Sequence, residues 1–358
     1  MTPEAIQKSE NIAILIPSLK KGGGEKQACL LARVLSEHYS VTMILSDVSQ
    51  GFEAENVTLS NLSEQDIVCL SGGVYKQYRQ LCEILRQRSI TLLFCYLSRA
   101  DVLGPIAAHA VGVRRCFQGL RNSVLPLWKT VLELIGSRFS TGAIANSYSG
   151  AKVFEKKGIR NISVIPNCFY NTREPEHRLG QDIVRVVTVA RFVNQKDYPT
   201  SIATMAKAMA ADSSIRYTII GHGELEHKVK QLVEDYGIED RTEILINPRG
   251  VLDLISKADI YLSTSLFEGT SNSIMEAMNV SLPVVATNVG DNARLVEDGV
   301  TGYILPVGDV KAFSDAIVRL AADPKLRDRM GVEANLRLQR EYSYSAFAKR
   351  YLNLVREV

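Results

Sequence analysis

The feature that most constrains the fold of this chain is a repeated alternation of short apolar runs with longer amphipathic segments. The apolar runs are rich in Val, Ile and Leu, which is typical of strands buried on both faces of a parallel sheet. Amphipathic segments such as 25–38 and 75–88 have the spacing of helices that cover such a sheet. In the first half of the chain the predicted strands are 11–17, 41–45, 91–96, 113–118 and 143–146.

The alternation stops at a polar segment, 168–182, and then starts again. Pro175 and Gly180 in this segment favour a linker. We therefore predict an α/β chain of two Rossmann-like, doubly wound domains, 1–170 and 171–342, that face a cleft in which ligands bind beyond the strand ends. The remaining segment, 343–358, is predicted as a helix that packs back on the N-terminal domain. The strands predicted in the second half are 184–190, 217–221, 244–246, 258–263 and 283–287.

Composition excludes several classes of protein. No apolar run approaches the roughly 20 residues that a membrane span needs, and the polar N-terminus lacks the apolar core of a signal peptide, so we expect a cytoplasmic protein. The six cysteines contain no C-x-x-C pair and mostly lie in apolar stretches, which favours buried free thiols. Neither a metal-binding histidine spacing nor a D-x-D sequence occurs, so we expect no metal requirement.

The net charge of +3 is unevenly distributed along the chain. Residues 1–170 carry 19 Lys and Arg against 13 Asp and Glu, whereas residues 171–358 carry 23 against 26. A basic first half suits an anionic partner such as a membrane surface or a phosphorylated lipid, although a difference of this size also arises by chance. A nucleic-acid partner is disfavoured, because no recognition motif accompanies the basic residues.

A run of glycines, Gly22 to Gly24, follows the first predicted strand. Glycine lets a backbone approach a ligand closely, and the N-terminus of the helix that follows favours an anion. The spacing matches neither G-x-G-x-x-G, since Gln27 holds the third position, nor a P-loop. A phosphate-binding loop and a plain flexible turn therefore both remain open.

Two cations follow the first strand of the second half, in the sequence VARFVNQKDYPT. Arg191 lies at the strand end and Lys196 five residues later, so both are predicted to point into the cleft. The forked guanidinium and the compact ammonium together suit a diphosphate, whereas the alternative is a pair of solvated surface charges. His222, between Gly221 and Gly223 in IIGHGEL, is a simple loop residue or a ligand contact.

Two glutamates eight residues apart, Glu268 and Glu276, lie in LFEGTSNSIMEAM. Ser273 and Glu276 match the S-x-x-E capping box of a helix start. If the helix begins nearer Ser271, the Glu276 carboxylate instead accepts hydrogen bonds from a pair of hydroxyls, as on a ribose. Glu268 then meets other hydroxyls of the same ligand, and the backbone N–H groups of residues 269–271 face its phosphate or sugar.

These motifs, in this order, resemble the retaining nucleotide-sugar glycosyltransferases of the GT-B fold, glycosyltransferase family 4 (glycosyl transferases group 1), of the kind that assemble bacterial surface polysaccharides. The resemblance rests on IPNCF, VARFVNQKDYP, GHGEL and the E-x7-E of KADIYLSTSLFEGTSNSIMEAM, and more loosely on the first glycine loop. It implies a UDP-sugar donor, with N-acetylhexosamine as a candidate sugar, no metal cofactor, and a polyprenyl-diphosphate-linked saccharide acceptor. A nucleotide-sugar 2-epimerase of similar fold and a non-enzymatic nucleotide-sugar-binding module are the alternatives.

The resemblance also implies a role for each motif. Arg191 and Lys196 would bind the donor diphosphate, and Glu276 the nucleotide ribose. Glu268 would contact the transferred sugar. The other donor contacts would be Gly23, Gly24, His222, Gly269, Thr270 and Ser271. Many family members have a histidine after the strand predicted here at 113–118, and Arg121 and Asn122 stand in its place. They would contact the donor sugar or a phosphorylated acceptor, and the alternative for Arg121 is a plain surface loop residue.

The sequence SVLPLWKTVLELIGSRF holds the single tryptophan, Trp128, and apolar residues at helical spacing. Lys129 and Arg138 flank these residues, so the segment could rest on a membrane as a basic amphipathic helix. The competing interpretation is a core helix packed on the sheet. The first interpretation places the protein on the cytoplasmic face of the inner membrane.

Overall fold

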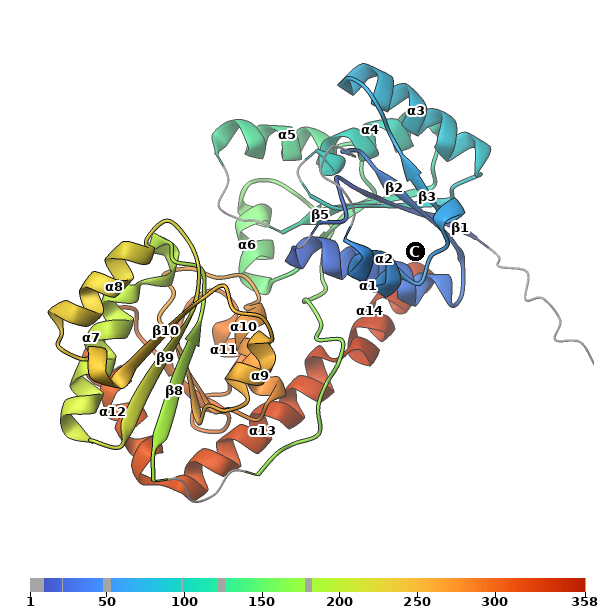
Figure 1. Ribbon diagram of the computed structural model, residues 1–358. Helices are drawn as coiled ribbons and strands as arrows, with labels where there is room; N and C mark the ends of the chain where they lie inside the picture. The colour runs from blue at the N-terminus through green and yellow to red at the C-terminus, as the bar shows by residue number, and fades with distance from the viewer. Residues whose placement is uncertain are drawn as a thin grey trace, which may run out of the picture. The chain divides into compact units, whose positions relative to one another are not determined.

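The computed structural model describes residues 10–20, 22–47, 53–97, 99–121, 126–177 and 182–357. The chain divides into two compact units, and each is a parallel sheet with helices on both faces (Figure 1). Unit 1 consists of Met1–Cys168 together with Tyr344–Val358, and unit 2 is Phe169–Ser343. The predicted α/β architecture of two doubly wound sheets is confirmed.

Unit 1 contains a sheet of seven parallel strands in the order β3-β2-β1-β4-β5-β6-β7. Its strands are buried apolar runs, as the alternation predicted, apart from the short edge strands. The strands are β1 (Asn11–Ile16), β2 (Ser40–Leu45), β3 (Ile67–Cys69), β4 (Leu92–Cys95), β5 (Arg115–Leu120), β6 (Gly142–Ala145) and β7 (Ile162–Val164). The helices are α1 (Gly23–Ser36), α2 (Ala54–Ser60), α3 (Val74–Gln87), α4 (Ala100–Val111), α5 (Leu127–Ser137), α6 (Tyr148–Lys156) and α14 (Tyr344–Glu357).

Unit 2 contains six parallel strands in the order β10-β9-β8-β11-β12-β13. Alternate residues of its strands enter two separate apolar cores, one on each face of the sheet. The strands are β8 (Val184–Val189), β9 (Ile215–Gly221), β10 (Thr242–Ile246), β11 (Ile260–Ser263), β12 (Val284–Thr287) and β13 (Gly302–Leu305). The helices are α7 (Tyr198–Ala211), α8 (Glu226–Asp235), α9 (Val251–Ile255), α10 (Asn272–Asn279), α11 (Asn292–Leu295), α12 (Val310–Ala322) and α13 (Pro324–Tyr342).

The sequence pattern missed three strands, β3, β7 and β13, which all lie at sheet edges. These strands are three or four residues long and mostly half-buried, so they lack the long apolar run that marks a central strand. The pattern also placed β5 two residues too early, at 113–118 rather than Arg115–Leu120. As a result Arg121 follows this strand directly.

The terminal helix α14 packs on unit 1, as predicted. The hydroxyls of Tyr351 and Tyr96 are 2.8 Å apart, and Arg115 Nη1 donates to the Val355 carbonyl at 2.6 Å. Tyr351 is also buried against the ring of Phe94. These contacts tie the last helix to β4 and β5.

The predicted linker is held on unit 2 where the structure describes it. The Arg173 backbone N–H donates to Asn279 Oδ1 at 2.8 Å, and the Glu176 N–H donates to Ser281 Oγ at 2.9 Å. Asn335 Nδ2 of α13 donates to the Arg173 carbonyl at 3.1 Å. Residues 169–177 therefore run along unit 2 and belong to it.

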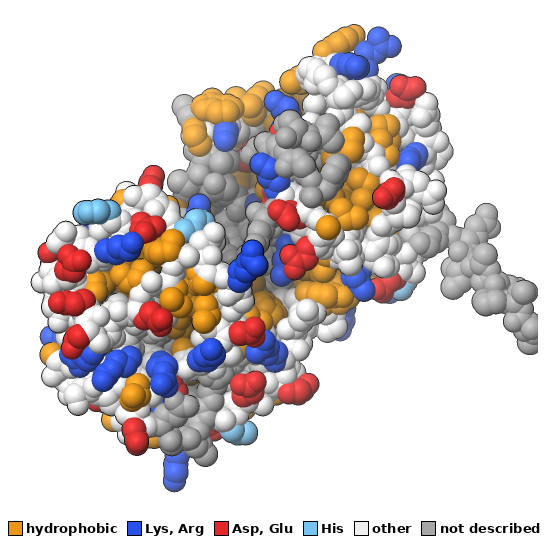
Figure 2. Space-filling model, viewed as in Figure 1, with side chains coloured by type: hydrophobic (Ala, Val, Ile, Leu, Met, Phe, Trp, Pro, Cys, Tyr) orange, Lys and Arg blue, Asp and Glu red, His pale blue; other side chains and the backbone are white. Residues whose placement is uncertain are grey.

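Helix α5 has an unusual polarity, with polar residues facing the sheet and apolar residues facing outward. Thr130 and Glu133 are buried, and Gln118 Nε2 of β5 donates to the Glu133 carbonyl at 3.0 Å. The interpretation of this segment as a core helix is therefore wrong for its apolar face, because the side chains of that face are exposed. Figure 2 shows hydrophobic side chains gathered over α5. The exposed apolar residues are Trp128, Val131, Leu132 and Ile135.

Two buried carboxyl groups, Asp101 of α4 and Glu133 of α5, predict a stability that falls as pH rises. Burial raises the pKa of Asp101 to about 8 and that of Glu133 to about 7, above ordinary values of 3.8 and 4.5. The folded state therefore holds protons that the unfolded chain has already lost, so stability is greatest at low pH and declines from about pH 4 to pH 8. We expect Asp101→Asn to flatten the dependence of the melting temperature on pH.

The amide introduced by Asp101→Asn would keep an acceptor for the Gly119 backbone N–H, which donates to Asp101 Oδ1 at 3.0 Å. Glu155→Gln, on the exposed surface of α6, is the control and should leave the slope unchanged. The measurement is thermal unfolding by circular dichroism over this range of pH. Equal slopes for wild type and Asp101→Asn would contradict the prediction.

Candidate functional site

The candidate site lies at the carboxyl ends of β8 and β11, which are neighbours in the sheet of unit 2. After β8 the chain continues to β9 on one side of it, and after β11 the chain continues to β12 on the opposite side. The connections that leave the carboxyl ends of β8 and β11 therefore run in opposite directions. This is the switch point at which open α/β sheets bind ligands. Arg191 and Lys196 follow β8, and Glu268 and Glu276 follow β11.

Hydrogen bonds fasten the two loops together. The Leu266 N–H donates to the Gln195 carbonyl at 2.8 Å, and Gln195 Nε2 donates to the Phe267 carbonyl at 2.7 Å. Thr264 Oγ1, at the end of β11, donates to the Lys196 carbonyl at 3.1 Å. The backbones that carry the predicted cations and the first glutamate are thus held in one fixed arrangement.

Lys196 and Glu268 form an ion pair across these loops. Lys196 Nζ lies 2.5 Å from Glu268 Oε1, and the two side chains are only 14% and 10% exposed. An ammonium has three donors, so this contact leaves two for a ligand oxygen. Arg191 is exposed, and its guanidinium makes no hydrogen bond or ion pair with the residues that the structure describes.

Helix α10 begins at Asn272, with Ser271 as its N-cap residue. The capping-box interpretation of Ser273 and Glu276 is therefore wrong: Ser273 is the second residue of the helix, and no side chain caps this end. Thr270 and Ser271, which precede the first turn of the helix, are buried. Glu276 lies one turn into the helix and is half-buried.

Tyr261, on β11, carries a buried phenol below the segment that holds the two glutamates. Tyr261 Oη donates to the Val189 carbonyl at 3.1 Å. Burial raises the pKa of this phenol, and the carboxylates of Glu276 and Glu268 raise it further. Both carboxylates therefore influence the same hydroxyl, Glu268 from the loop after β11 and Glu276 from α10.

The remaining unit 2 candidates lie in neighbouring loops. His222 is exposed, and its carbonyl accepts from the Phe192 N–H at 2.8 Å, which places the loop after β9 beside the loop of Arg191. Gly221 permits this contact, since a Cβ there would lie 2.0 Å from the Ala190 carbonyl oxygen. Gly269 and the buried Thr270 and Ser271 connect Glu268 to α10.

Sequence reasoning missed the loop between β12 and α11. The Asp291 N–H donates to the Gly269 carbonyl at 3.2 Å. Gly290 has φ +56°, and a Cβ on it would lie 2.1 Å from the Glu268 carbonyl oxygen. The signal was available in ATNVGDNA, where a glycine stands between a strand and a helix as in the other site loops.

In unit 1 the predicted glycine loop is shorter than expected. Gly23 and Gly24 already belong to the first turn of α1, and Gly22 is its N-cap residue. A Cβ on Gly24 would lie 3.1 Å from the Leu97 side chain, so this glycine allows α1 to begin close to the end of β4. Arg121 lies at the end of β5, and Asn122 lies outside the described residues.

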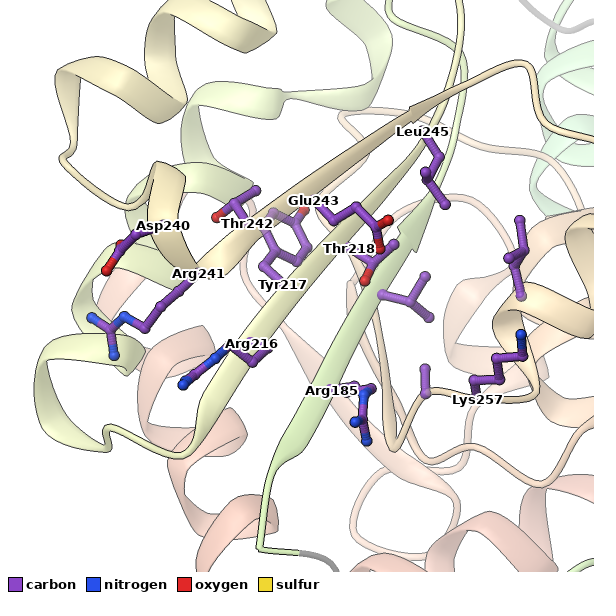
Figure 3. Close-up of a pocket in the computed structure, with 13 residues that line it drawn as sticks. Arg185, Arg216, Tyr217, Thr218, Asp240, Arg241, Thr242, Glu243, Leu245 and Lys257 are labelled. Atoms are coloured by element: carbon purple, nitrogen blue, oxygen red, sulfur yellow. The ribbon is translucent and has the colours of Figure 1, made fainter.

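Metal-binding clusters and membrane-spanning helices are absent from the described ranges, and a surface cavity lies elsewhere on unit 2. No group of His, Cys, Asp or Glu side chains there could hold a metal ion, and metal independence stays a prediction. None of the helices there combines the length and the hydropathy needed to cross a membrane. A cavity of about 350 Å³, lined by residues such as Arg185, Arg216 and Glu243, lies at the amino ends of β8–β10, away from the candidate site (Figure 3).

Comparison with known proteins identifies the class that the fold and site define. Residues 172–337 match the family described as Glycosyl transferases group 1. The fold of the whole chain is the GT-B fold: the crystal structure of Anabaena HepE in complex with UDP superimposes with a TM-score of 0.79 at 17% identity, covering 98% of this chain and all of that one.

Two relatives illustrate the sequence similarity. The amylovoran biosynthesis glycosyltransferase AmsK of Erwinia amylovora is 32% identical over 176 residues, which cover 47% of this chain. The UDP-Gal:alpha-D-GlcNAc-diphosphoundecaprenol alpha-1,3-galactosyltransferase of Escherichia coli is 24% identical over 277 residues, which cover 70% of this chain and 71% of that enzyme. The chain spans less than half of AmsK, 42% of its length.

Proposed function

We propose that this protein is a retaining glycosyltransferase that transfers a sugar from UDP to a lipid-linked saccharide in bacterial polysaccharide assembly. The observation that supports the proposal is the ion pair of Lys196 with Glu268 at the switch point of unit 2, on loops that also carry Arg191 and lead to Glu276. Two cations beside two carboxylates suit a ligand with both a diphosphate and hydroxyl-bearing sugars. The transferred sugar is a hexose or an N-acetylhexosamine.

In the proposed reaction UDP leaves with the electrons of the bond between the sugar and its β-phosphate. The acceptor hydroxyl attacks the same face of the sugar and gives its proton to the departing phosphate oxygen. Arg191 and Lys196 stabilise the charge that develops on the diphosphate, and no metal is required. Glu276 binds the ribose. Glu268 orients Lys196 through their ion pair and contacts the transferred sugar. The contacts that complete the donor site in unit 2 are His222, Gly269, Thr270 and Ser271.

Thermal stabilisation by nucleotide sugars tests the donor site. A ligand at 100 times its Kd adds about 2.7 kcal/mol to the free energy of unfolding. We expect UDP-sugars to raise the melting temperature of the wild type, with or without chelator, and Glu276→Ala to abolish most of the shift. Glu234→Ala, an exposed glutamate on α8, is the control. No shift with any nucleotide sugar would overturn the proposal.

Product analysis separates this activity from its alternatives. A glycosyltransferase releases UDP only when an acceptor is supplied from a lipid extract. An epimerised sugar formed from the donor alone would identify a 2-epimerase instead. Binding without UDP release in any extract would identify a nucleotide-sugar-binding module.

A membrane surface is the proposed location of the acceptor, on the cytoplasmic face of the inner membrane. Support comes from α5, whose exposed apolar side chains include Trp128 at 61% exposure, with Lys129 beside it. We expect the emission of this single tryptophan to shift to the blue when vesicles containing anionic lipid are added. Trp128→Phe with a new tryptophan at exposed Tyr236, on unit 2, is the control and should show no shift.

A further inference from the structure

Arg121 is held rigidly at the carboxyl end of the unit 1 sheet. Its guanidinium lies over the ring of Tyr96, with 4.4 Å between Cζ and the ring centroid. Arg121 Nη1 donates to Asn167 Oδ1 at 3.1 Å. Tyr96 is itself fixed by the hydroxyl of Tyr351, at 2.8 Å. The arginine therefore has one orientation, which is set by segments after β4, β5 and β7 and by α14.

This rigid guanidinium lacks an acidic partner. Among the described residues Arg121 forms no ion pair, and its buried Nε donates to no acceptor. The carboxyl group that influences it is Asp101, whose pKa burial raises to about 8, so this group is largely protonated at neutral pH. Arg121 is half-buried, and a partly desolvated guanidinium with an unpartnered buried Nε is costly, which is the arrangement expected where an anionic ligand supplies the missing charge.

Two further cations lie near the same place. Burial raises the pKa of the Cys168 thiol to about 12, while three nearby cations act to lower it: Lys26, Arg121 and Arg350. Lys26 comes from the first turn of α1, and Arg350 from α14. Gln27 fastens α1 to this segment, since its side chain donates to the Cys168 carbonyl and accepts from the Cys168 N–H, each at 3.0 Å.

We propose that Arg121, with Lys26 and Arg350, binds a phosphate group of the acceptor. A planar guanidinium offers paired donors that match phosphate oxygens, and flanking cations favour a diphosphate over a neutral sugar. The carboxyl ends of β4 and β5, where Arg121 lies, are a ligand-binding edge in sheets of this topology. The inference rests on the proposed function, and it assigns the binding of the acceptor's phosphate to residues of unit 1.

Calorimetry with inorganic pyrophosphate and farnesyl diphosphate tests the inference. Saturating UDP is present throughout, so that the donor site is already occupied. We expect both probes to bind the wild type and Arg121→Gln to weaken binding about tenfold, the effect of one charge-assisted hydrogen bond. Arg114→Gln removes an exposed arginine at the other end of β5 and should change the affinity less than twofold. UDP affinity should be equal in all three proteins.

Several outcomes would overturn the inference. Equal affinity of Arg121→Gln and Arg114→Gln for both probes would do so, as would a wild type that binds neither probe. A lower melting temperature of Arg121→Gln with unchanged probe affinity would show that the arginine only braces Tyr96 against α14. If Arg121→Gln does not fold, Lys26→Gln, on the exposed first turn of α1, replaces it and should weaken binding about threefold. Failure of the wild type to bind UDP would instead contradict the donor site.

Discussion

Replacing Lys196 with alanine is expected to lower kcat for sugar transfer by about 10²–10³-fold, the effect of removing one preset donor to developing negative charge. Lys196 Nζ lies 2.5 Å from Glu268 Oε1, so the same change leaves a carboxylate that is only 10% exposed without its cation. Stability should therefore fall as well, by about 1–3 kcal/mol. The measurements are steady-state release of UDP and unfolding in urea.

The double variant Lys196→Ala/Glu268→Ala separates the two effects. Removing both partners takes away the unpaired carboxylate, so we expect the double variant to regain most of the lost stability but none of the lost turnover. Lys207→Ala, an exposed lysine on α7, is the control and should match the wild type in both measurements. Turnover that recovers together with stability would mean that Lys196 acts only on the fold.

Gly290→Ala is expected to lower donor binding and turnover, although Gly290 is not itself proposed as a donor contact. The new Cβ would lie 2.1 Å from the Glu268 carbonyl oxygen, so the loop that carries Glu268 and Gly269 must shift. A displacement of about 1 Å at a reacting site lowers activity by about 10²-fold. We expect a loss of this size in kcat/KM, together with weaker UDP binding measured by calorimetry.

Gly299→Ala is the matched control for this substitution. Gly290 and Gly299 have φ of +56° and +75°, so alanine costs about 1–2 kcal/mol of backbone strain at either position. No atom lies within 4 Å of a Cβ on Gly299, so only Gly290→Ala adds a collision. Similar losses of activity in the two variants would show that general strain, rather than movement of the Glu268 loop, is responsible.

The central part of each sheet could be predicted from the sequence because its strands are continuous apolar runs separated by amphipathic helices. The edge strands β3, β7 and β13 could not, because a short strand with one covered side needs few apolar residues. The sequence also did not show which face of α5 is exposed to solvent. Apolar residues at helical spacing indicate one face of a helix, but they do not tell whether that face meets the sheet or the solvent.

The candidate site was predictable where residues follow a strand directly. Arg191, Lys196, Glu268 and Glu276 each follow β8 or β11, and parallel strands bring their carboxyl ends to one edge. Contacts between loops were not predictable in this way. The approach of Gly290 to Glu268 joins residues that follow different strands, and the pairing of the strands has to be known before such a contact can be inferred.

The return of α14 to unit 1 reverses the order in which the two units can be completed during synthesis. Domains usually finish folding from the N-terminus as the ribosome releases them. Here unit 2, Phe169–Ser343, is continuous, whereas unit 1 includes Tyr344–Val358, which is synthesised after unit 2. Until then the side chains of Phe94 and Tyr96 lack the cover of Tyr351. During synthesis unit 1 therefore lacks its last helix until unit 2 has been translated.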